Sequence, residues 1–107
     1  MRHKFNAKPT TFNDQRYSSK LEAKYAQRLN TAKEKGELVF WLEQVPFLLP
    51  GSLRYKIDFM EFWAPKDGQE IGDIICTEVK GMETKDWIMR KKLFESTYPI
   101  PLNIVKK

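Results

Sequence analysis

Two charged residues end an apolar segment in the C-terminal half of the chain, where burial is expected instead. Glu78 and Lys80 lie at the end of the run Ile-Ile-Cys-Thr, which is typical of a strand. Because alternate side chains of a strand share one face, Glu78 and Lys80 point the same way, about 6 to 7 Å apart. The alternative is a strand that simply emerges into solvent at Thr77, with no role in chemistry for the pair.

Asp58 lies between bulky apolar residues of another predicted strand, at residues 53–63. A charged carboxylate inside a sheet costs several kcal/mol unless it is paired, metal-bound or neutralised. The segment 64–68 predicts a turn. Asp58 and Glu78 each lie about ten residues from it, so an antiparallel hairpin brings both carboxylates to a similar height. Two carboxylates that close repel each other unless a cation lies between them. The alternative is an Asp58 that faces water from an edge strand.

The residue types that the chain lacks restrict the kind of cation. His3 is the only histidine and Cys76 the only cysteine. This argues against a zinc site, a histidine-based nucleophile and a disulfide framework. A cation held by oxygen ligands alone is typically Mg²⁺ or Mn²⁺.

A further carboxylate, Glu22, lies near the start of a predicted helix that Ser18 or Ser19 can cap. Apolar residues recur there at helical spacing, and Gly36 follows where a helix-ending glycine belongs. Glu22 lies beside the apolar stripe, where it could join a site. It also completes a capping box with Ser19, in which the glutamate bonds back to the start of the helix. The two interpretations stay open, and both can be partly true.

The chain of 107 residues carries 19 Lys and Arg against 14 Asp and Glu, a formal net charge of +5. An excess of positive charge on so small a chain favours a polyanion as partner, nucleic acid first, although it can also serve solubility alone. No apolar stretch is long enough for a membrane span and no signal peptide is evident, so we expect a cytoplasmic protein without a membrane partner. The residues expected to bind phosphates are Lys4, Lys8, Arg54, Lys56, Lys85, Arg90, Lys91 and Lys92.

The pattern predicts one domain over residues 1–107, with a basic arm at 1–17 and a core at 18–107. The core should hold a helix from about 18 to 35, strands at 38–42, 53–63 and 71–79, a helix at 85–96 and a closing strand at 102–105. Residues 1–17 show no sustained period, so no regular element is expected there.

The order of these elements and the placement of the acids resemble the PD-(D/E)XK nuclease core. More narrowly, the chain resembles a family of short phage and prophage proteins of unknown function. One departure is Ile57, which stands where the motif name has a proline. The segments that carry the narrower resemblance span nearly the whole chain: Lys4–Lys8, Ser19–Ala23, Gln44–Phe47, Tyr55–Phe59, Glu78–Met82 and Lys91–Glu95.

The resemblance implies an α/β (α+β) fold with a restriction-endonuclease-like core and a mixed central sheet. It also implies metal-assisted hydrolysis of phosphodiester bonds by a Mg²⁺- or Mn²⁺-dependent endonuclease. In such a site Asp58, Glu78 and the carbonyl of Val79 hold the metal, and Lys80 stabilises charge or orients water. Glu22 corresponds to the extra carboxylate of resolvase-like members, and Gln44 to an auxiliary glutamine.

The same resemblance points to branched or structured DNA, such as four-way junctions, and to homodimers that cut two strands symmetrically. The process served would be phage DNA recombination, replication or packaging. Two other classes compete with the enzyme. One is a non-catalytic basic DNA-binding phage protein, and the other is a small protein that binds a host protein. Neither gives a role to acids that converge near a lysine, which favours the enzyme.

Overall fold

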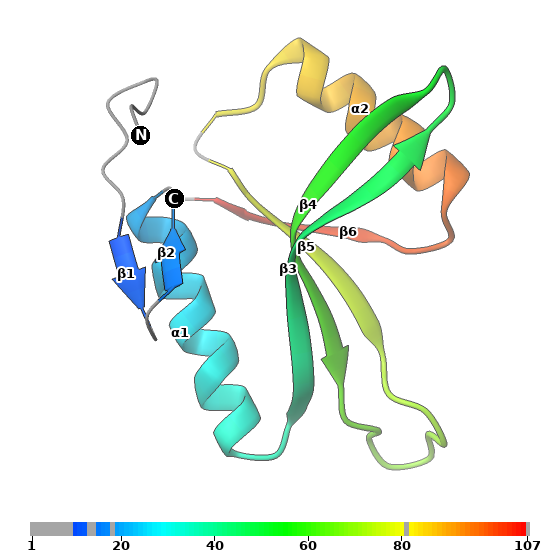
Figure 1. Cartoon of the computed structure of the whole chain (residues 1–107). Helices are drawn as coiled ribbons and strands as arrows, with labels where there is room; N and C mark the ends of the chain where they lie inside the picture. Colours follow the sequence, from blue (N-terminus) through cyan, green and yellow to red (C-terminus); the bar gives the residue numbers. More distant parts are fainter. Residues whose placement is uncertain (1–9, 13–14, 18, 81, 107) are drawn as a thin grey trace.

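The structure is a computed structural model that describes residues 10–12, 15–17, 19–80 and 82–106 (Figure 1). Lys4 and Lys8, two of the expected phosphate-binding residues, lie outside the described residues. Within the described part, the elements in chain order are β1 (Thr10–Phe12), β2 (Gln15–Tyr17), α1 (Lys20–Glu34), β3 (Leu38–Leu49), β4 (Leu53–Trp63), β5 (Ile74–Lys80), α2 (Lys85–Thr97) and β6 (Leu102–Lys106).

The central sheet has four strands in the order β3-β4-β5-β6. β3 pairs with β4 and β4 with β5 in antiparallel fashion, whereas β5 and β6 are parallel. A parallel pair needs a crossover connection, and α2 supplies it. The predicted helix-strand-strand-strand-helix-strand order with a mixed sheet is therefore confirmed.

Two strand boundaries differ clearly from those expected. β3 continues to Leu49 instead of ending at residue 42, and it includes Pro46. Proline lacks a backbone N–H and is tolerated in an edge strand, which β3 is. β5 begins at Ile74, so Ile71 lies before the strand and is 81% exposed.

The expectation of an arm without regular structure at residues 1–17 is wrong for the part that the structure describes. β1 and β2 pair as an antiparallel hairpin, with Thr10 opposite Tyr17. The Tyr17 side chain is buried in the core beside α1. The pairing spans only three residues on each strand, too few to produce a detectable period in the sequence.

The ends of α1 follow local chemistry. Ser19, not Ser18, is the N-cap residue, and its hydroxyl accepts a hydrogen bond from the Glu22 N–H at 3.1 Å. Gly36 follows the C-cap with φ +79°, a left-handed conformation that glycine adopts without steric cost. No described helix is long and apolar enough to cross a membrane.

The two helices cover opposite faces of the sheet, as Figure 1 shows. Residues of α1 pack with Phe59 and Val79, whereas α2 packs with Ile57 and Cys76. Ile57 and Phe59 thus enter different clusters, although alternate residues of a flat strand share a face. Figure 1 shows that β3 and β4 are strongly twisted, which allows Ile57 and Phe59 to meet different helices.

A buried glutamate, Glu61, lies beneath α1 and is only 1% exposed. The Tyr25 hydroxyl donates to its Oε2 at 2.6 Å and the Trp63 indole N–H donates to its Oε1 at 3.0 Å. The Tyr25 hydroxyl also lies 3.4 Å from Thr77 Oγ1, which accepts from the Asn103 side-chain amide. This network joins α1 to β4, β5 and β6 and gives each Glu61 oxygen a donor, as a buried carboxylate requires.

Tyr25→Phe is expected to lower the free energy of unfolding by about 1 to 3 kcal/mol, because one oxygen of a buried carboxylate loses its donor. Urea denaturation measures the change. Tyr98→Phe is the matched control, since the partly exposed Tyr98 hydroxyl donates to the Leu48 carbonyl at 2.7 Å and water can replace it there. Equal losses in the two variants would contradict a special role for the buried network.

Candidate functional site

The site forms where the backbone pairing of β4 with β5 stops. The last paired residues are Phe59 and Thr77. Beyond them, the Asp58 N–H donates to Glu78 Oε1 and the Val79 N–H donates to Asp58 Oδ2, both at 2.9 Å. Each carboxylate therefore replaces a backbone acceptor for the opposite strand, and the two acids face each other across the strands. The similar height predicted from the turn is confirmed.

Burial makes this pair of acids electrostatically costly. Glu78 is 2% exposed. Its pKa is raised from an ordinary 4.5 to about 7, first by burial and then by the charge of Asp58. Burial also raises the pKa of Asp58, against the hydrogen bonds from Val79 and Gln44 and the charge of Lys80. At neutral pH both carboxylates can be ionised at low cost only if positive charge is brought close.

Lys80 supplies part of that positive charge. Its Nζ lies 3.6 Å from Glu78 Oε2, so the predicted shared face of Glu78 and Lys80 is confirmed. The ammonium group also lies over the ring of Trp87, 5.2 Å from the centroid, an attractive cation–π geometry. Lys80 remains about 29% exposed, so its ammonium can reach a bound anion.

Trp87 is placed by the start of α2. Thr84 caps that helix, and its hydroxyl accepts from the Trp87 N–H at 3.1 Å. The indole lies close to Glu78, whose pKa it lowers slightly, and to the Tyr55 hydroxyl. Neither the indole N–H nor that hydroxyl makes a well-formed hydrogen bond within the described residues. Two buried donors are thus held beside the Glu78 carboxylate.

Gln44 reaches the site from the edge strand. The register pairs Glu43 with Phe59 and Val45 with Ile57, which puts Gln44 opposite Asp58. Its side-chain amide donates to Asp58 Oδ1 at 3.3 Å. The backbone of Gln44 has φ +53°, an uncommon conformation for a residue with a side chain. The residue is strained where its side chain meets the candidate site.

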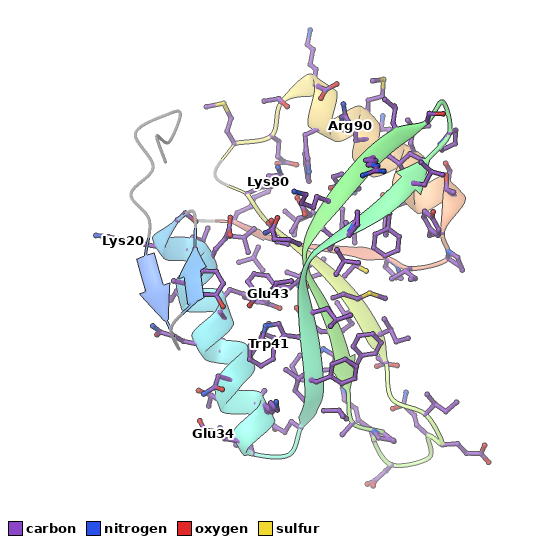
Figure 2. The ribbon with its side chains drawn as sticks, viewed as in Figure 1. Lys20, Glu34, Trp41, Glu43, Lys80 and Arg90 are labelled. Carbon is purple, nitrogen blue, oxygen red and sulfur yellow. The ribbon has the colours of Figure 1, made fainter. Side chains whose placement is uncertain are left out.

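Glu22 belongs to a different group of residues. Its charge raises the pKa of Tyr17, whose hydroxyl donates to Glu43 Oε2 at 2.7 Å. Trp41 also donates to Glu43, at 2.9 Å, and Figure 2 shows Glu43 and Trp41 on β3 facing α1. Among the described residues, no three Asp, Glu, His or Cys side chains form a group that could hold a metal ion. Glu22 is therefore not found as a third ligand beside Asp58 and Glu78.

The oxygen atoms that face one another where the β4–β5 pairing ends nevertheless suit a hard cation as ligands. The N–H and C=O of one strand residue point toward the same neighbouring strand, and the Val79 N–H points at Asp58. The Val79 carbonyl thus faces the same gap as the two carboxylates. Oxygen donors of this kind suit Mg²⁺ or Mn²⁺, and Mg²⁺ commonly keeps several water ligands in addition to a few protein oxygens.

The described basic residues expected to bind phosphates are not equivalent. Arg54 and Lys56 on β4, and Lys85 and Lys92 on α2, are exposed. Arg90 instead pairs with Asp86 at 3.0 Å and donates to the Arg54 carbonyl, and Lys91 pairs with Glu95 at 3.0 Å. Part of the positive charge of α2 is thus compensated within the helix.

A model for a family described as proteins of unknown function (DUF1064) matches residues 2–106. The chain belongs to this family. No curated protein and no solved structure gives a significant match. Membership of the DUF1064 family carries no activity with it, so the geometry of the site has to support any function.

The structure brings together four of the expected residues: Asp58, Glu78 and Lys80, which the sequence pattern indicated, and Gln44, which the resemblance implied. The positions of Trp87 and Tyr55 beside them were not expected. Both are aromatic residues in segments whose sequence is also typical of the hydrophobic core, and both are 5% exposed. Only the tertiary structure shows that their polar atoms lie beside Glu78. The sequence offered one indirect signal, which is the N-cap residue Thr84 three positions before Trp87.

The raised pKa of Glu78 predicts a pH-dependent stability of the metal-free protein. The unfolded chain loses this proton near pH 4.5, whereas the folded chain keeps it to about pH 7. The protonated Glu78 therefore stabilises the folded state fully below pH 4.5. This stabilisation, up to about 3 kcal/mol in the free energy of unfolding, is lost as the pH rises through 7. Urea denaturation in EDTA at pH 5 and pH 8 measures it.

Glu78→Gln should remove most of that pH dependence, because the amide does not titrate and its oxygen can still accept from the Asp58 N–H. Glu37→Gln, at an exposed position, is the control and should leave the dependence as in the parent protein. An unchanged dependence in Glu78→Gln would show that another group is responsible.

Proposed function

We propose that this protein is a metal-dependent endodeoxyribonuclease that hydrolyses phosphodiester bonds. One observation carries the proposal: Asp58 and Glu78 face each other where the β4–β5 pairing ends, with Lys80 on the same face. A site that only binds phosphate gains nothing from two buried acids, because they repel the ligand. Two acids beside a lysine instead suit a cation and a phosphate held together.

In this proposal Asp58, Glu78 and the Val79 carbonyl hold Mg²⁺ or Mn²⁺. When bound, the metal polarises the scissile phosphate and lowers the pKa of a water molecule. Lys80 approaches the same phosphate and stabilises the negative charge that develops on it. Trp87 holds the Lys80 ammonium in place through its ring, and Gln44 fixes the orientation of the Asp58 carboxylate.

Glu22 has a smaller role in this proposal than the resemblance implies. In this proposal Glu22, whose charge acts on the Tyr17 hydroxyl, orients water molecules around the metal and does not bind the ion directly. A preference for branched DNA, action as a homodimer and a role in phage DNA recombination, replication or packaging remain predictions from the resemblance. The principal competing function is a non-catalytic DNA-binding protein, in which the acids are structural.

Lys80→Ala is expected to leave the fold intact and to lower the cleavage rate by orders of magnitude. Shortening this partly exposed side chain leaves no buried cavity, and Glu78 can take up a proton when its partner is lost. The fold therefore persists, whereas the positive charge at the phosphate is lost. Single-turnover cleavage of labelled DNA measures the effect. Lys66→Ala, in the exposed turn between β4 and β5, is the control and should cut normally. Equal rates in both variants would remove Lys80 from the mechanism.

The substrates should be labelled four-way junction, flap, duplex and single-stranded DNA, each with Mg²⁺, Mn²⁺ or EDTA. Metal-dependent cutting is expected, and the preferred substrate identifies the class of nuclease. Binding without cutting under every condition would instead support the DNA-binding alternative.

Asp58→Asn is expected to abolish metal binding without destabilising the metal-free protein, because it removes the repulsion with Glu78 while an amide oxygen can still accept from the Val79 N–H. In the parent protein, Mn²⁺ should raise the melting temperature at pH 8, since a ligand that binds only the folded state stabilises it. The shift should be absent in Asp58→Asn. A clearly lower melting temperature of Asp58→Asn in EDTA would identify a structural aspartate instead.

A further inference from the structure

A pocket of about 220 Å³ lies between α1 and β6, away from the carboxylate pair. Three cationic side chains border it: Lys24 and Arg28 from α1, and Lys106 from the end of β6. Lys24 and Arg28 are four residues apart, so they lie one above the other on the same face of the helix. Among the described residues, no carboxylate lines the pocket. None of these three residues belongs to the set that the sequence predicts as phosphate contacts.

The charges at this pocket are less compensated than those of α2. Neither Lys24 nor Arg28 takes part in an ion pair within the described residues, whereas Arg90 and Lys91 on α2 each pair with an acid on the same helix. Lys106 pairs with Glu83. Two neighbouring cations without an acidic partner in the described part of the chain make the potential at this concave surface favourable for an anion.

The pocket lies at the same end of the sheet as the carboxylate pair. β5 and β6 run parallel, and Lys106 is the register partner of Lys80. Neighbouring strands lie about 4.8 Å apart, so the β6 wall of the pocket is one strand away from the strand that carries Glu78 and Lys80. Figure 1 shows the C-terminal end of β6 beside the beginning of α1. The pocket lies on the face that α1 covers, whereas Lys80 lies over Trp87 of α2, on the opposite face. A polyanion that contacts both places therefore has to pass over the ends of β5 and β6.

We propose that this pocket binds a backbone phosphate of the same nucleic acid whose scissile phosphate lies at the carboxylate pair, with Lys24 and Arg28 as the principal contacts. The proposal rests on the proposed function for the identity of the ligand, since the pocket by itself selects only for anionic groups. In this proposal residues of α1 bind the nucleic-acid backbone, and residues of β4 and β5 carry out the hydrolysis. Contacts to phosphate are independent of base sequence.

The test measures the dissociation constants of labelled duplex and single-stranded DNA by fluorescence polarisation at several salt concentrations. EDTA is present so that metal-dependent cutting cannot occur. The variant Lys24→Gln/Arg28→Gln removes both charges and keeps side chains of similar reach. The matched control is Lys35→Gln/Lys66→Gln, which removes two exposed charges outside the pocket. Both variants have the same net charge and should melt at the parent temperature.

The pocket variant is expected to bind about tenfold more weakly, with a salt slope shallower by about 1 to 2, because each lost phosphate contact releases one fewer counterion. The control should stay within about twofold of the parent protein. Equal weakening in both variants would show a general effect of net charge and overturn the proposal, as would an unchanged pocket variant. Polyglutamate that competes as strongly as DNA, and only with an intact pocket, would assign the pocket to an acidic protein instead.

These outcomes separate the pocket from the nuclease. Loss of binding confined to the pocket variant, with no cutting of any DNA by the parent protein, would retain the pocket and remove the proposed catalysis. Metal-dependent cutting together with unaltered binding by the pocket variant would retain the catalysis and remove the pocket.

Discussion

The end of the β4–β5 backbone pairing is the constraint on which the candidate site depends. Two strand amides, those of Asp58 and Val79, still need acceptors beyond the last backbone pair, and the carboxylates of Glu78 and Asp58 provide them. Buried amides are almost always satisfied, so the two acids are held close together despite their repulsion. The cost appears as the raised pKa of both groups, and a bound cation would offset it.

The surrounding elements hold this arrangement from both sides. On the α2 side, the Thr84 cap fixes the first turn of the helix and thereby places Trp87 under Lys80 and beside Glu78. On the α1 side, the Tyr25–Glu61 hydrogen bond ties the helix to β4, three residues beyond Asp58. From the edge strand, Gln44 reaches Asp58 from a strained backbone conformation. The Trp87 and Gln44 contacts restrict the side chains of Lys80 and Asp58, and the Tyr25–Glu61 hydrogen bond holds the strand that carries Asp58.

The distribution of compensated charge separates two basic surfaces that look alike in composition. The lysines and arginines of α2 follow one another in the sequence, but acids four residues away engage Arg90 and Lys91. Lys24 and Arg28 of α1 lie four residues apart, so they share one face of the helix, and no acid lies between them on that face. Paired cations such as Arg90 and Lys91 therefore attract an anion less strongly than cations on one face that lack an acidic partner.

Several parts of the fold were determined by short-range chemistry that the sequence displays. The α1 boundaries follow from Ser19 and Gly36, and the β4–β5 hairpin follows from the turn at 64–68. That hairpin sets the register, so the opposition of Asp58 and Glu78 could be predicted. The shared face of Glu78 and Lys80 follows from the two-residue period of a strand.

Only the tertiary structure decided the rest, because it depends on contacts between segments distant in the chain. β3 continues through Pro46 since it lies at the edge of the sheet and has one partner strand. Tyr17 enters the core because β1 and β2 pair beside α1. Glu22 lies near Tyr17 instead of joining the acid pair, and Trp87 lies under Lys80. Helical spacing fixes which residues share a face, but packing decides what that face meets.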